Sequence, residues 1–317
     1  MTAPHTPPHA EGPFSRHAGH AHGHGGVHEG HEPDWDAMAD HLVREAELLS
    51  PFLEQAAGWL AGLLQDGAGE PGAAVRRLLD VGSGPGVATC VLARTFPGAE
   101  AVAVDASAPL LERAGARAAE LGLADRVTTR QAELPDGVAA LGAADLIWSS
   151  QAVHHLGDQQ AALRDLGRLL RPGGVLAVVE RGLPQRFLPR DIGIGRPGLQ
   201  ARLDAAHEDV FAQMRAELPG HVAVVEDWPA LLAAAGVTPA GTRTFLTEHP
   251  APLHAAARAH LHSHLTRLRD RLGESLDAED RATLELLVDR DADEGILRRP
   301  DAFLLNATTV HAGRIPG

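Results

Sequence analysis

A glycine-rich turn between two apolar stretches is the first feature of this chain that suggests chemistry. The segment Asp80–Gly86 reads Asp-Val-Gly-Ser-Gly-Pro-Gly; it follows Leu78-Leu79 and precedes the apolar segment Val87–Ala93. This pattern predicts a strand, a turn and the start of a helix. Glycine lets a ligand approach bare backbone, and the N–H groups at a helix N-terminus favour an anionic group. We therefore expect this turn to bind a small-molecule cofactor.

Polar residues also end the apolar segments that follow. Asp105 ends the second predicted strand, where a carboxylate can accept hydrogen bonds from both hydroxyls of a ribose. Gln131 ends the third predicted strand, Ser149 ends the fourth, and the pair His154-His155 comes shortly afterwards. Because the carboxyl ends of parallel strands meet at one edge of a sheet, we expect these side chains to surround one ligand.

The spacing of the glycines separates two classes of cofactor. A nicotinamide site favours the pattern G-x-G-x-x-G, which needs a glycine where this chain has Val87. Here Gly82, Gly84 and Gly86 give the pattern G-x-G-x-G. The acid at the end of the second strand does not discriminate, because cofactors of both classes contain a ribose.

Alternating strands and helices would bring these residues to one sheet edge. The predicted strands cover residues 77–81, 101–105, 126–130, 146–148 and 175–180, and the predicted helices between them cover 87–95, 109–121 and 158–170. Such alternation predicts an α/β fold with a parallel sheet and helices on both faces. Further along, we predict a helix at 227–236, a strand at 242–247, a long helical region at 252–289 and a last strand at 303–310.

At this point the sequence resembles the class I S-adenosylmethionine-dependent methyltransferases. The stretches that carry the resemblance are Asp80–Gly86, Val104-Asp105, Ala132–Pro135, Asp145–Leu156 and Leu169–Leu176, which lie in family order within roughly residues 75–182. The resemblance implies a Rossmann-like, doubly wound, mostly parallel seven-stranded sheet with helical cap insertions. It also implies an enzyme that uses S-adenosylmethionine as its cofactor.

The resemblance implies a role for each matching position. Asp80 would hold the amino group of the methionine part, Asp105 would bind the ribose, and Ala132 would lie against the adenine. Many relatives have Asp in place of Gln131, although Gln can still accept through its carbonyl oxygen. The predicted cofactor-binding residues are Asp80, Gly82, Ser83, Gly84, Gly86, Asp105, Ala106, Gln131, Ala132 and Ser149.

His154 and His155 are the predicted catalytic residues. Methyl transfer mainly requires alignment of the nucleophile with the methyl carbon, and a base is needed only where the nucleophile carries a proton. One of the two imidazoles could take that proton from a hydroxyl group. The alternative is that the pair only packs or caps at the start of a helix.

Charge and composition indicate the kind of methyl acceptor. The formal net charge is −14 at pH 7, which disfavours nucleic acid as a partner. No Asn-Pro-Pro-Tyr sequence follows the fourth predicted strand, so the resemblance to enzymes that methylate nucleic-acid amino groups stops short. We predict methyl transfer to O, N or C of a small molecule, in secondary metabolism. Many apolar residues within 183–300 suggest that this acceptor is apolar or aromatic.

Composition also divides the chain into segments. We predict a disordered His-rich leader at 1–33, an N-terminal helical lid at 34–72, a cofactor-binding core at 73–182, a helical cap with one core helix and one strand at 183–300, and a closing strand and tail at 301–317. No apolar run is long enough to span a bilayer and no signal-peptide core is evident, so we expect a cytoplasmic protein without membrane contact. The oligomeric state is left open, with a homodimer as one option.

Histidines leave a competing function open. Eight of them lie in the leader, where they could bind a metal or simply occupy a disordered tail. His260 and His264 share one helix face with His262 opposite, and these side chains could bind a metal, face solvent or line a pocket; we predict no metal site. Glu180, at the end of the fifth strand, could orient a substrate or cap the strand. The competing functions are a cofactor- or metal-binding protein without transferase activity, and an S-adenosylmethionine-dependent catalyst that does not methylate.

Overall fold

The computed structural model describes residues 35–66, 75–180 and 182–316. The predicted His-rich leader therefore lies outside the described residues. Within them, no helix has the length and apolar character that crossing a bilayer requires.

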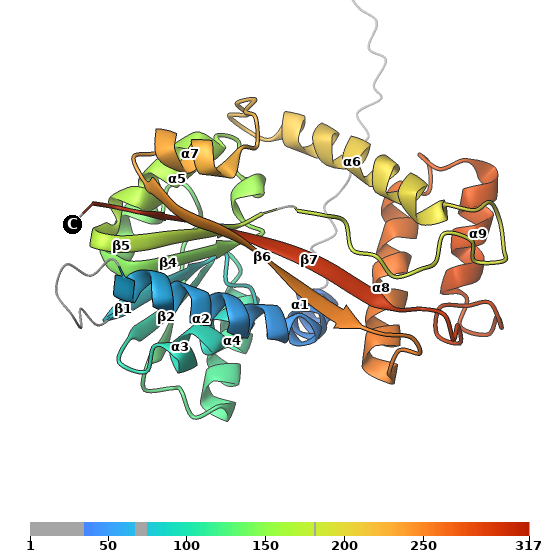
Figure 1. The fold of residues 1–317 in the computed structure, drawn as a ribbon, viewed down its shortest axis with the longest axis horizontal. Coiled ribbons are helices and arrows are strands. Elements are labelled where there is room, and N and C mark those ends of the chain that lie inside the picture. Colours follow the sequence, from blue (N-terminus) through green and yellow to red (C-terminus); the bar gives the residue numbers. More distant parts are fainter. Residues whose placement is uncertain (1–34, 67–74, 181, 317) are drawn as a thin grey trace, which may run out of the picture. The chain divides into compact units, whose positions relative to one another are not determined.

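A seven-stranded, mostly parallel sheet forms the centre of the fold (Figure 1). The strand order is β3-β2-β1-β4-β5-β7-β6, and only β7 runs antiparallel to its neighbours. The strands are β1 (Arg77–Val81), β2 (Glu100–Asp105), β3 (Val127–Gln131), β4 (Ala144–Ser150), β5 (Leu170–Val179), β6 (Thr238–His249) and β7 (Leu304–Arg314). The predicted Rossmann-like α/β class with seven strands is confirmed.

Helices cover both faces of this sheet, because its central strands alternate their apolar side chains. Leu78 of β1 packs into the core beneath α2 (Ser50–Asp66) and α3 (Val87–Thr95). Leu79, which points to the opposite face, packs beneath α5 (Gln159–Arg168) and α7 (Trp228–Ala234). α4 (Ala108–Glu120) contacts β2 and β3. Helices on both faces place the loops that follow the parallel strands at one edge of the sheet.

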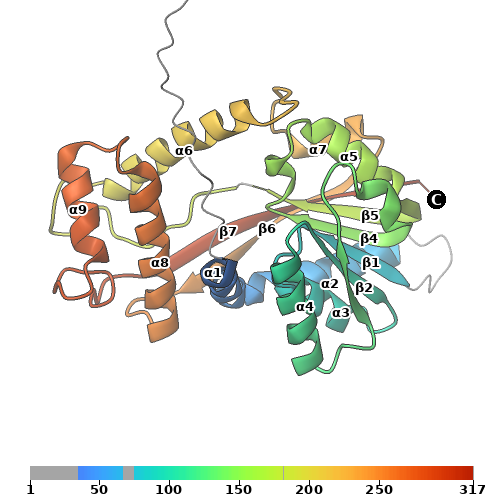
Figure 2. The same ribbon diagram turned by 180° about the vertical axis from the view of Figure 1, so that it is seen from behind.

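The last two strands extend beyond the sheet and lead to a group of helices. β6 pairs with β7 from Thr238–Arg314 to His249–Leu304, whereas β5 pairs with only four residues of β7. At the far end of this hairpin lie α6 (Leu199–Glu217), α8 (Ala255–Leu272) and α9 (Ala278–Val288) (Figures 1 and 2). These three helices share an apolar core of their own, which includes Phe187, Leu203, Leu261 and Leu284. We refer to α6, α8 and α9 as the cap.

Two helices precede the first strand, between residues 35 and 66. α1 (Trp35–Leu48) and α2 meet at Leu49. Phe52, Ala56 and Leu60 of α2 are buried against the sheet. α1 packs instead against α8 and α4, and its Leu48 joins the core of the cap.

Candidate active site

The three glycines of the turn after β1 have different neighbours. All three have positive φ, and a Cβ on Gly82 would lie 2.4 Å from the Cβ of Ala152. A Cβ on Gly86 would lie 2.6 Å from the Cβ of Ala114 on α4. A Cβ on Gly84 would meet only the Cδ1 atom of Leu42, at 3.9 Å. Gly82 and Gly86 therefore allow close packing of the turn, and Gly84 has open space beside it for a ligand.

Asp105 fixes the shape of this turn from the end of β2. Its Oδ2 atom accepts a hydrogen bond from the backbone N–H of Gly84 at 2.9 Å, and its Oδ1 atom accepts one from Ser107 at 2.9 Å. The side-chain NH₂ of Gln131 donates to the carbonyl oxygen of Ala106 at 2.9 Å. The carbonyl oxygen of the Gln131 side chain then stays available to accept a hydrogen bond from the adenine, which remains a prediction. Parallel pairing brings Asp105 and Gln131 directly opposite each other.

Asp80 lies beneath the turn and is fully buried. Thr89 of α3 donates a hydrogen bond from its hydroxyl group to Asp80 Oδ2 at 2.5 Å. Burial raises the pKa of Asp80 to about 7 and the nearby carboxylate of Asp105 adds to this rise, whereas the hydrogen bond from Thr89 opposes it. Asp80 can therefore change its protonation state near neutral pH, and a cation bound nearby would favour its ionised form.

His154 forms a buried pair with Glu180 at the ends of β4 and β5. The Nδ1 atom of His154 lies 2.6 Å from Glu180 Oε2. The other oxygen of Glu180 accepts hydrogen bonds from the backbone N–H groups of Ala152 and Val153, at 3.2 and 2.8 Å. Both side chains are buried. Glu180 therefore orients the imidazole of His154 and also holds the loop that carries it.

His155 lies beside this pair, with its ring centroid 4.1 Å from that of His154. Burial lowers the pKa of His155, and the neighbouring His154 lowers it further. Arg215 of α6 donates hydrogen bonds from Nη1 to the backbone carbonyls of His154 and Leu156, at 2.7 and 2.6 Å. A helix of the cap thus fixes the segment that carries both histidines.

A cavity of about 510 Å³ opens beside these histidines. It is lined by residues that follow β4 and β5, by α1, by α6 and α8 of the cap, and by β7. Its lining residues include Leu42, Gln151, His154, His155, Phe187 and His264. The cavity therefore joins the carboxyl edge of the sheet to the cap.

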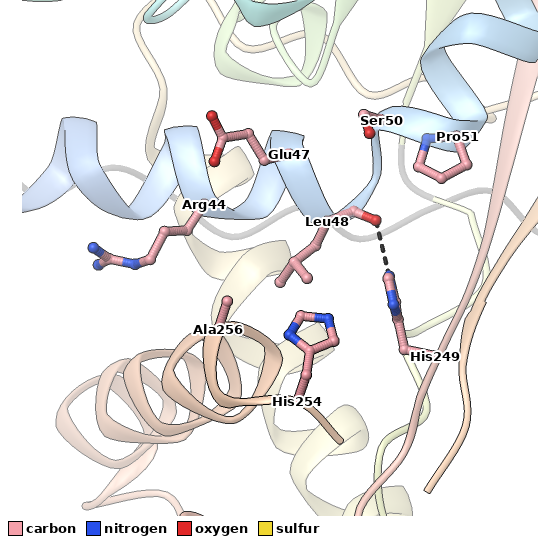
Figure 3. Close-up of a pocket in the computed structure, with 8 residues that line it drawn as sticks. All are labelled: Arg44, Glu47, Leu48, Ser50, Pro51, His249, His254 and Ala256. Atoms are coloured by element: carbon pink, nitrogen blue, oxygen red, sulfur yellow. Dashed lines mark hydrogen bonds between the residues drawn. The ribbon is translucent and has the colours of Figure 1, made fainter. Parts of the chain in front are cut away.

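A second pocket, of about 350 Å³, lies where α1 meets α2 (Figure 3). Arg44, Leu48, His249 and His254 are among its lining residues, and His249 donates a hydrogen bond from Nε2 to the carbonyl oxygen of Leu48 at 3.0 Å. None of the predicted site residues lines this pocket. We interpret this pocket as a gap in the packing of α1, α2 and α8 against the end of β6.

The geometry above coincides with a match to known proteins. Residues 79–176 match the family described as a methyltransferase domain. This range runs from the end of β1 to β5 and includes the turn, Asp105 and both histidines. Residues 79–176 therefore form a domain similar to those of the class I S-adenosylmethionine-dependent methyltransferases.

Curated relatives share this methyltransferase domain. Trans-aconitate 2-methyltransferase of Methylobacterium radiotolerans is 34% identical over 163 residues, which cover 46% of this chain and 59% of that protein. Methyltransferase GfsG of Streptomyces halstedii is 32% identical over 157 residues, which cover 49% of this chain and 50% of that protein. The chain thus spans less than two thirds of the length of these relatives. An O-methyltransferase family protein from Burkholderia thailandensis shares the fold, with a TM-score of 0.50 and 15% identity over 89% of this chain and 60% of that chain.

The cofactor of such a methyltransferase domain is S-adenosylmethionine, and the site of this chain fits it. Gly84 leaves space next to bare backbone, as a closely approaching ligand requires. Ser149, at the end of β4, is fully buried, and its hydroxyl has no hydrogen-bond partner in the described part of the chain. A buried hydroxyl without a partner is rare in proteins, and a bound ligand would satisfy it. The roles that the sequence assigned to individual cofactor-binding residues stay predictions.

Three contributors to this site were missed or left open at the sequence level. Thr89 pairs with Asp80, Arg215 holds the histidine loop, and Glu180 orients His154. Glu180 could be suspected because it ends a predicted strand, whereas neither Thr89 nor Arg215 lies in a motif.

The cap histidines do not assemble a metal site in the described residues. His262 donates a hydrogen bond from Nε2 to the carbonyl oxygen of Val288 at 2.9 Å, which ties α8 to the end of α9. His260 and His264 stack with their ring centroids 6.3 Å apart. No group of three or more metal-ligating side chains is found among the residues that the structure describes.

Proposed function

We propose that this protein transfers the methyl group of S-adenosylmethionine to a small molecule that binds in the cavity between the sheet and the cap. The cavity of about 510 Å³ carries this proposal, because it adjoins both histidines and suits a small acceptor. The acceptor would enter between α1, the cap and β7. The net charge of −14 supports a small molecule rather than a nucleic acid.

The His154–Glu180 pair supplies the acid–base chemistry in this proposal. The sulfonium of S-adenosylmethionine supplies an activated methyl group, so the protein mainly has to align the acceptor and accept a proton. Glu180 accepts a hydrogen bond from the Nδ1–H group of His154, which leaves Nε2 as the basic nitrogen. His155 would keep a neutral imidazole beside it, because its pKa is lowered. A hydroxyl or ammonium group of the acceptor would lose its proton to Nε2 of His154.

The apolar side chains around the cavity support an acceptor with an apolar or aromatic body. Leu42, Leu49, Phe52 and Phe187 contribute such surface. The names of the relatives describe other acceptors, such as trans-aconitate, and say nothing of the cap of this chain. A role in secondary metabolism, a cytoplasmic location and a homodimer stay predictions.

A direct test is to incubate the purified protein with S-adenosylmethionine and a panel of small phenols, amines and carbon acids. Appearance of S-adenosylhomocysteine together with a product heavier by one methyl substituent would support the proposal. A product without the added methyl would favour a non-methylating catalyst instead. Nickel or zinc calorimetry on the full chain and on a variant without residues 1–33 tests the competing metal-binding function. Tight binding that depends on residues 1–33, with no methylation of any acceptor, would favour that function.

A further inference from the structure

A second cluster of titratable side chains, which does not include the His154–Glu180 pair, lies between α1 and α8. His41 and Glu45 belong to α1, and His260 and His264 belong to α8. These two helices pack against each other (Figure 2). Glu45 and His264 also line the cavity to which the proposed function assigns the methyl acceptor. We call these two residues the polar wall of the cavity.

Contacts within the cluster hold the polar wall in place. The ring of His41 stacks on that of His260, with centroids 5.3 Å apart and an interplanar angle of 11°. His260 stacks in turn on His264 at 6.3 Å and 14°. The Nε2 atom of His41 lies 3.3 Å from Glu45 Oε2, and the rings of Phe187 and His264 are nearly perpendicular, with centroids 5.5 Å apart. Side chains fixed in this way lose little conformational freedom when a ligand binds.

Burial and neighbouring charges determine what the polar wall offers. Burial alone would raise the pKa of Glu45, but a hydrogen bond with His41 and the nearby imidazoles outweigh it and lower the pKa to about 2. Burial lowers the pKa of His264 to about 3, and His260 and Arg267 add to this effect. At neutral pH the wall therefore presents a carboxylate and an uncharged imidazole.

Both residues of the wall keep hydrogen-bonding capacity for a ligand. The Oε1 atom of Glu45 has no hydrogen-bond or ion-pair partner among the described residues. Neither ring nitrogen of His264 has a hydrogen-bond partner in the same part of the chain. Asp204 of α6 also lines this cavity, but its carboxylate pairs with Arg186. The carboxylate of Glu45 and an imidazole nitrogen of His264 together suit a cationic donor.

We propose that Glu45 and His264 bind a protonated amine of the methyl acceptor, so that the acceptors of this enzyme are amine-bearing small molecules. An alkylammonium group has a positive charge for Glu45 and several N–H donors to share with the imidazole of His264. The apolar part of such a molecule would lie against Phe187 and the other apolar lining residues. An acceptor with a carboxylate at the same place would instead meet a like charge. The inference rests on the proposed function, because it identifies the cavity as the acceptor site.

Matched probes that differ in one group can test this inference by calorimetry in the presence of S-adenosylhomocysteine. The probes are pairs of a primary amine and its uncharged analogue, such as tyramine and 4-ethylphenol, together with the anionic 4-hydroxyphenylacetate. We expect the amine of at least one pair to bind roughly tenfold more tightly than its partners, as a charge-assisted hydrogen bond implies. Equal affinity within every pair overturns the inference.

Variants then assign the preference to the polar wall. Glu45→Gln keeps the shape of the side chain but removes its charge, and should abolish most of the amine preference. His264→Phe retains an aromatic ring against Phe187 but removes both nitrogens, and should weaken amine binding more than phenol binding. Glu47→Gln is the control, because Glu47 lies on the same helix, is exposed and pairs with Arg117 of α4. An unchanged preference in Glu45→Gln overturns the assignment.

Cofactor binding separates failure of this inference from failure of the proposed function. Affinity for S-adenosylhomocysteine should be the same in Glu45→Gln and in the parent protein, since the inference gives Glu45 no role toward the cofactor. A parent protein that binds S-adenosylhomocysteine and methylates only acceptors without an amine contradicts the inference alone. A parent protein that binds no S-adenosylhomocysteine contradicts the proposed function itself.

Discussion

His154 Nδ1 and Glu180 Oε2 lie 2.6 Å apart in a buried setting, although the two residues are 26 positions apart in the chain. Pairing of β4 with β5 brings them together, because Ser150 lies opposite Val179 at the ends of the two strands. The same carboxylate accepts two backbone N–H groups, so it cannot turn away from the imidazole without leaving buried donors unsatisfied. The sheet therefore fixes both the tautomer and the direction of His154.

Substitution of Glu180 by Gln should lower kcat at least about tenfold, which is part of the hundredfold or more that a general base contributes. The amide of Gln cannot stabilise an imidazolium at His154 as a carboxylate does, whereas substrate binding should change little. Steady-state kinetics will separate kcat from KM. Glu226→Gln serves as the control, because Glu226 is exposed and accepts a hydrogen bond from the side-chain amide of Gln159, outside the His154–Glu180 pair. An unchanged kcat in Glu180→Gln would reduce the pair to a structural role.

His154→Asn and His155→Asn should have different effects on the pH dependence of kcat. If His154 is the base, its loss removes the acid limb of the profile and lowers the plateau roughly a hundredfold. Burial lowers the pKa of His155 below its usual value of 6.5, so this imidazole becomes charged only at a lower pH than a free histidine, and His155→Asn should leave the acid limb in place. The reverse pattern in the two profiles would assign the base to His155.

Asp105→Ala should weaken binding of S-adenosylmethionine by roughly tenfold to a hundredfold, since a hydrogen bond to a charged group contributes about 1.5–3 kcal/mol. The same change should lower the free energy of unfolding by about 1–3 kcal/mol, because the N–H groups of Gly84 and Ser107 lose their acceptors. Calorimetry and thermal unfolding measure the two effects separately. Asp105→Asn retains one acceptor oxygen and should recover part of the stability but little of the affinity. Full affinity in Asp105→Ala would remove Asp105 from the ribose site.

The central strands and the cofactor turn could be predicted from the sequence because local signals determine them. Strand β1 and helix α3 begin and end where predicted, since a glycine turn separates two continuous apolar runs there. Strand β6 is longer than the predicted 242–247, because it pairs with β7 from Thr238 to His249. Pairing between segments so far apart leaves little trace in local periodicity.

The chemical partners of the site residues were harder to predict, because they come from distant segments. Strand order alone could place several predicted site residues at the carboxyl edge of the sheet. These residues are Asp105, Gln131 and the pair His154-His155. The pairing of His154 with Glu180 depends on the register of β4 and β5, and the contact between α1 and α8 depends on how the cap folds back. Glu45 belongs to no motif, so only its position on the cavity reveals it.

Asp280→Asn should lower the free energy of unfolding by about 1–3 kcal/mol. This is less than the loss expected when a fully buried ion pair is broken, because the arginine partners of Asp280 are partly exposed. Asp280 is buried and accepts hydrogen bonds from Arg202 Nε at 2.6 Å and from Arg196 Nη2 at 2.9 Å, which join α9 to α6 and to the segment before it. The hydrogen bond with Arg202 lowers the pKa of Asp280 although burial opposes it, so this stabilisation should fade as the pH falls below 3.8. Urea unfolding measures the change. Glu274→Gln, at an exposed position between α8 and α9, is the control, and equal stability of the two variants would contradict the prediction.

Asp80 should make the stability of the cofactor-free protein depend on pH near neutrality. Its pKa is raised from 3.8 to about 7, so the folded state favours the protonated carboxyl. The resulting stabilisation is complete below pH 3.8 and is lost as the pH rises toward 7 and beyond. Its upper limit is about 4 kcal/mol, because each unit of difference between the folded and unfolded pKa corresponds to about 1.36 kcal/mol. Asp80→Asn mimics the protonated form, and its amide oxygen can still accept a hydrogen bond from the hydroxyl group of Thr89.

Thermal unfolding of the cofactor-free protein at pH 5 and pH 8 tests whether Asp80 makes its stability depend on pH. The melting temperature of Asp80→Asn should exceed that of the parent protein by more at pH 8 than at pH 5. Asp136→Asn, at an exposed position after β3, should show no such difference. Because the amino group and sulfonium of S-adenosylmethionine are cationic, binding should ionise Asp80 and release a proton near pH 7, which calorimetry in buffers of different ionisation enthalpy can detect. Release of the same number of protons by Asp80→Asn would show that the proton comes from elsewhere in the site.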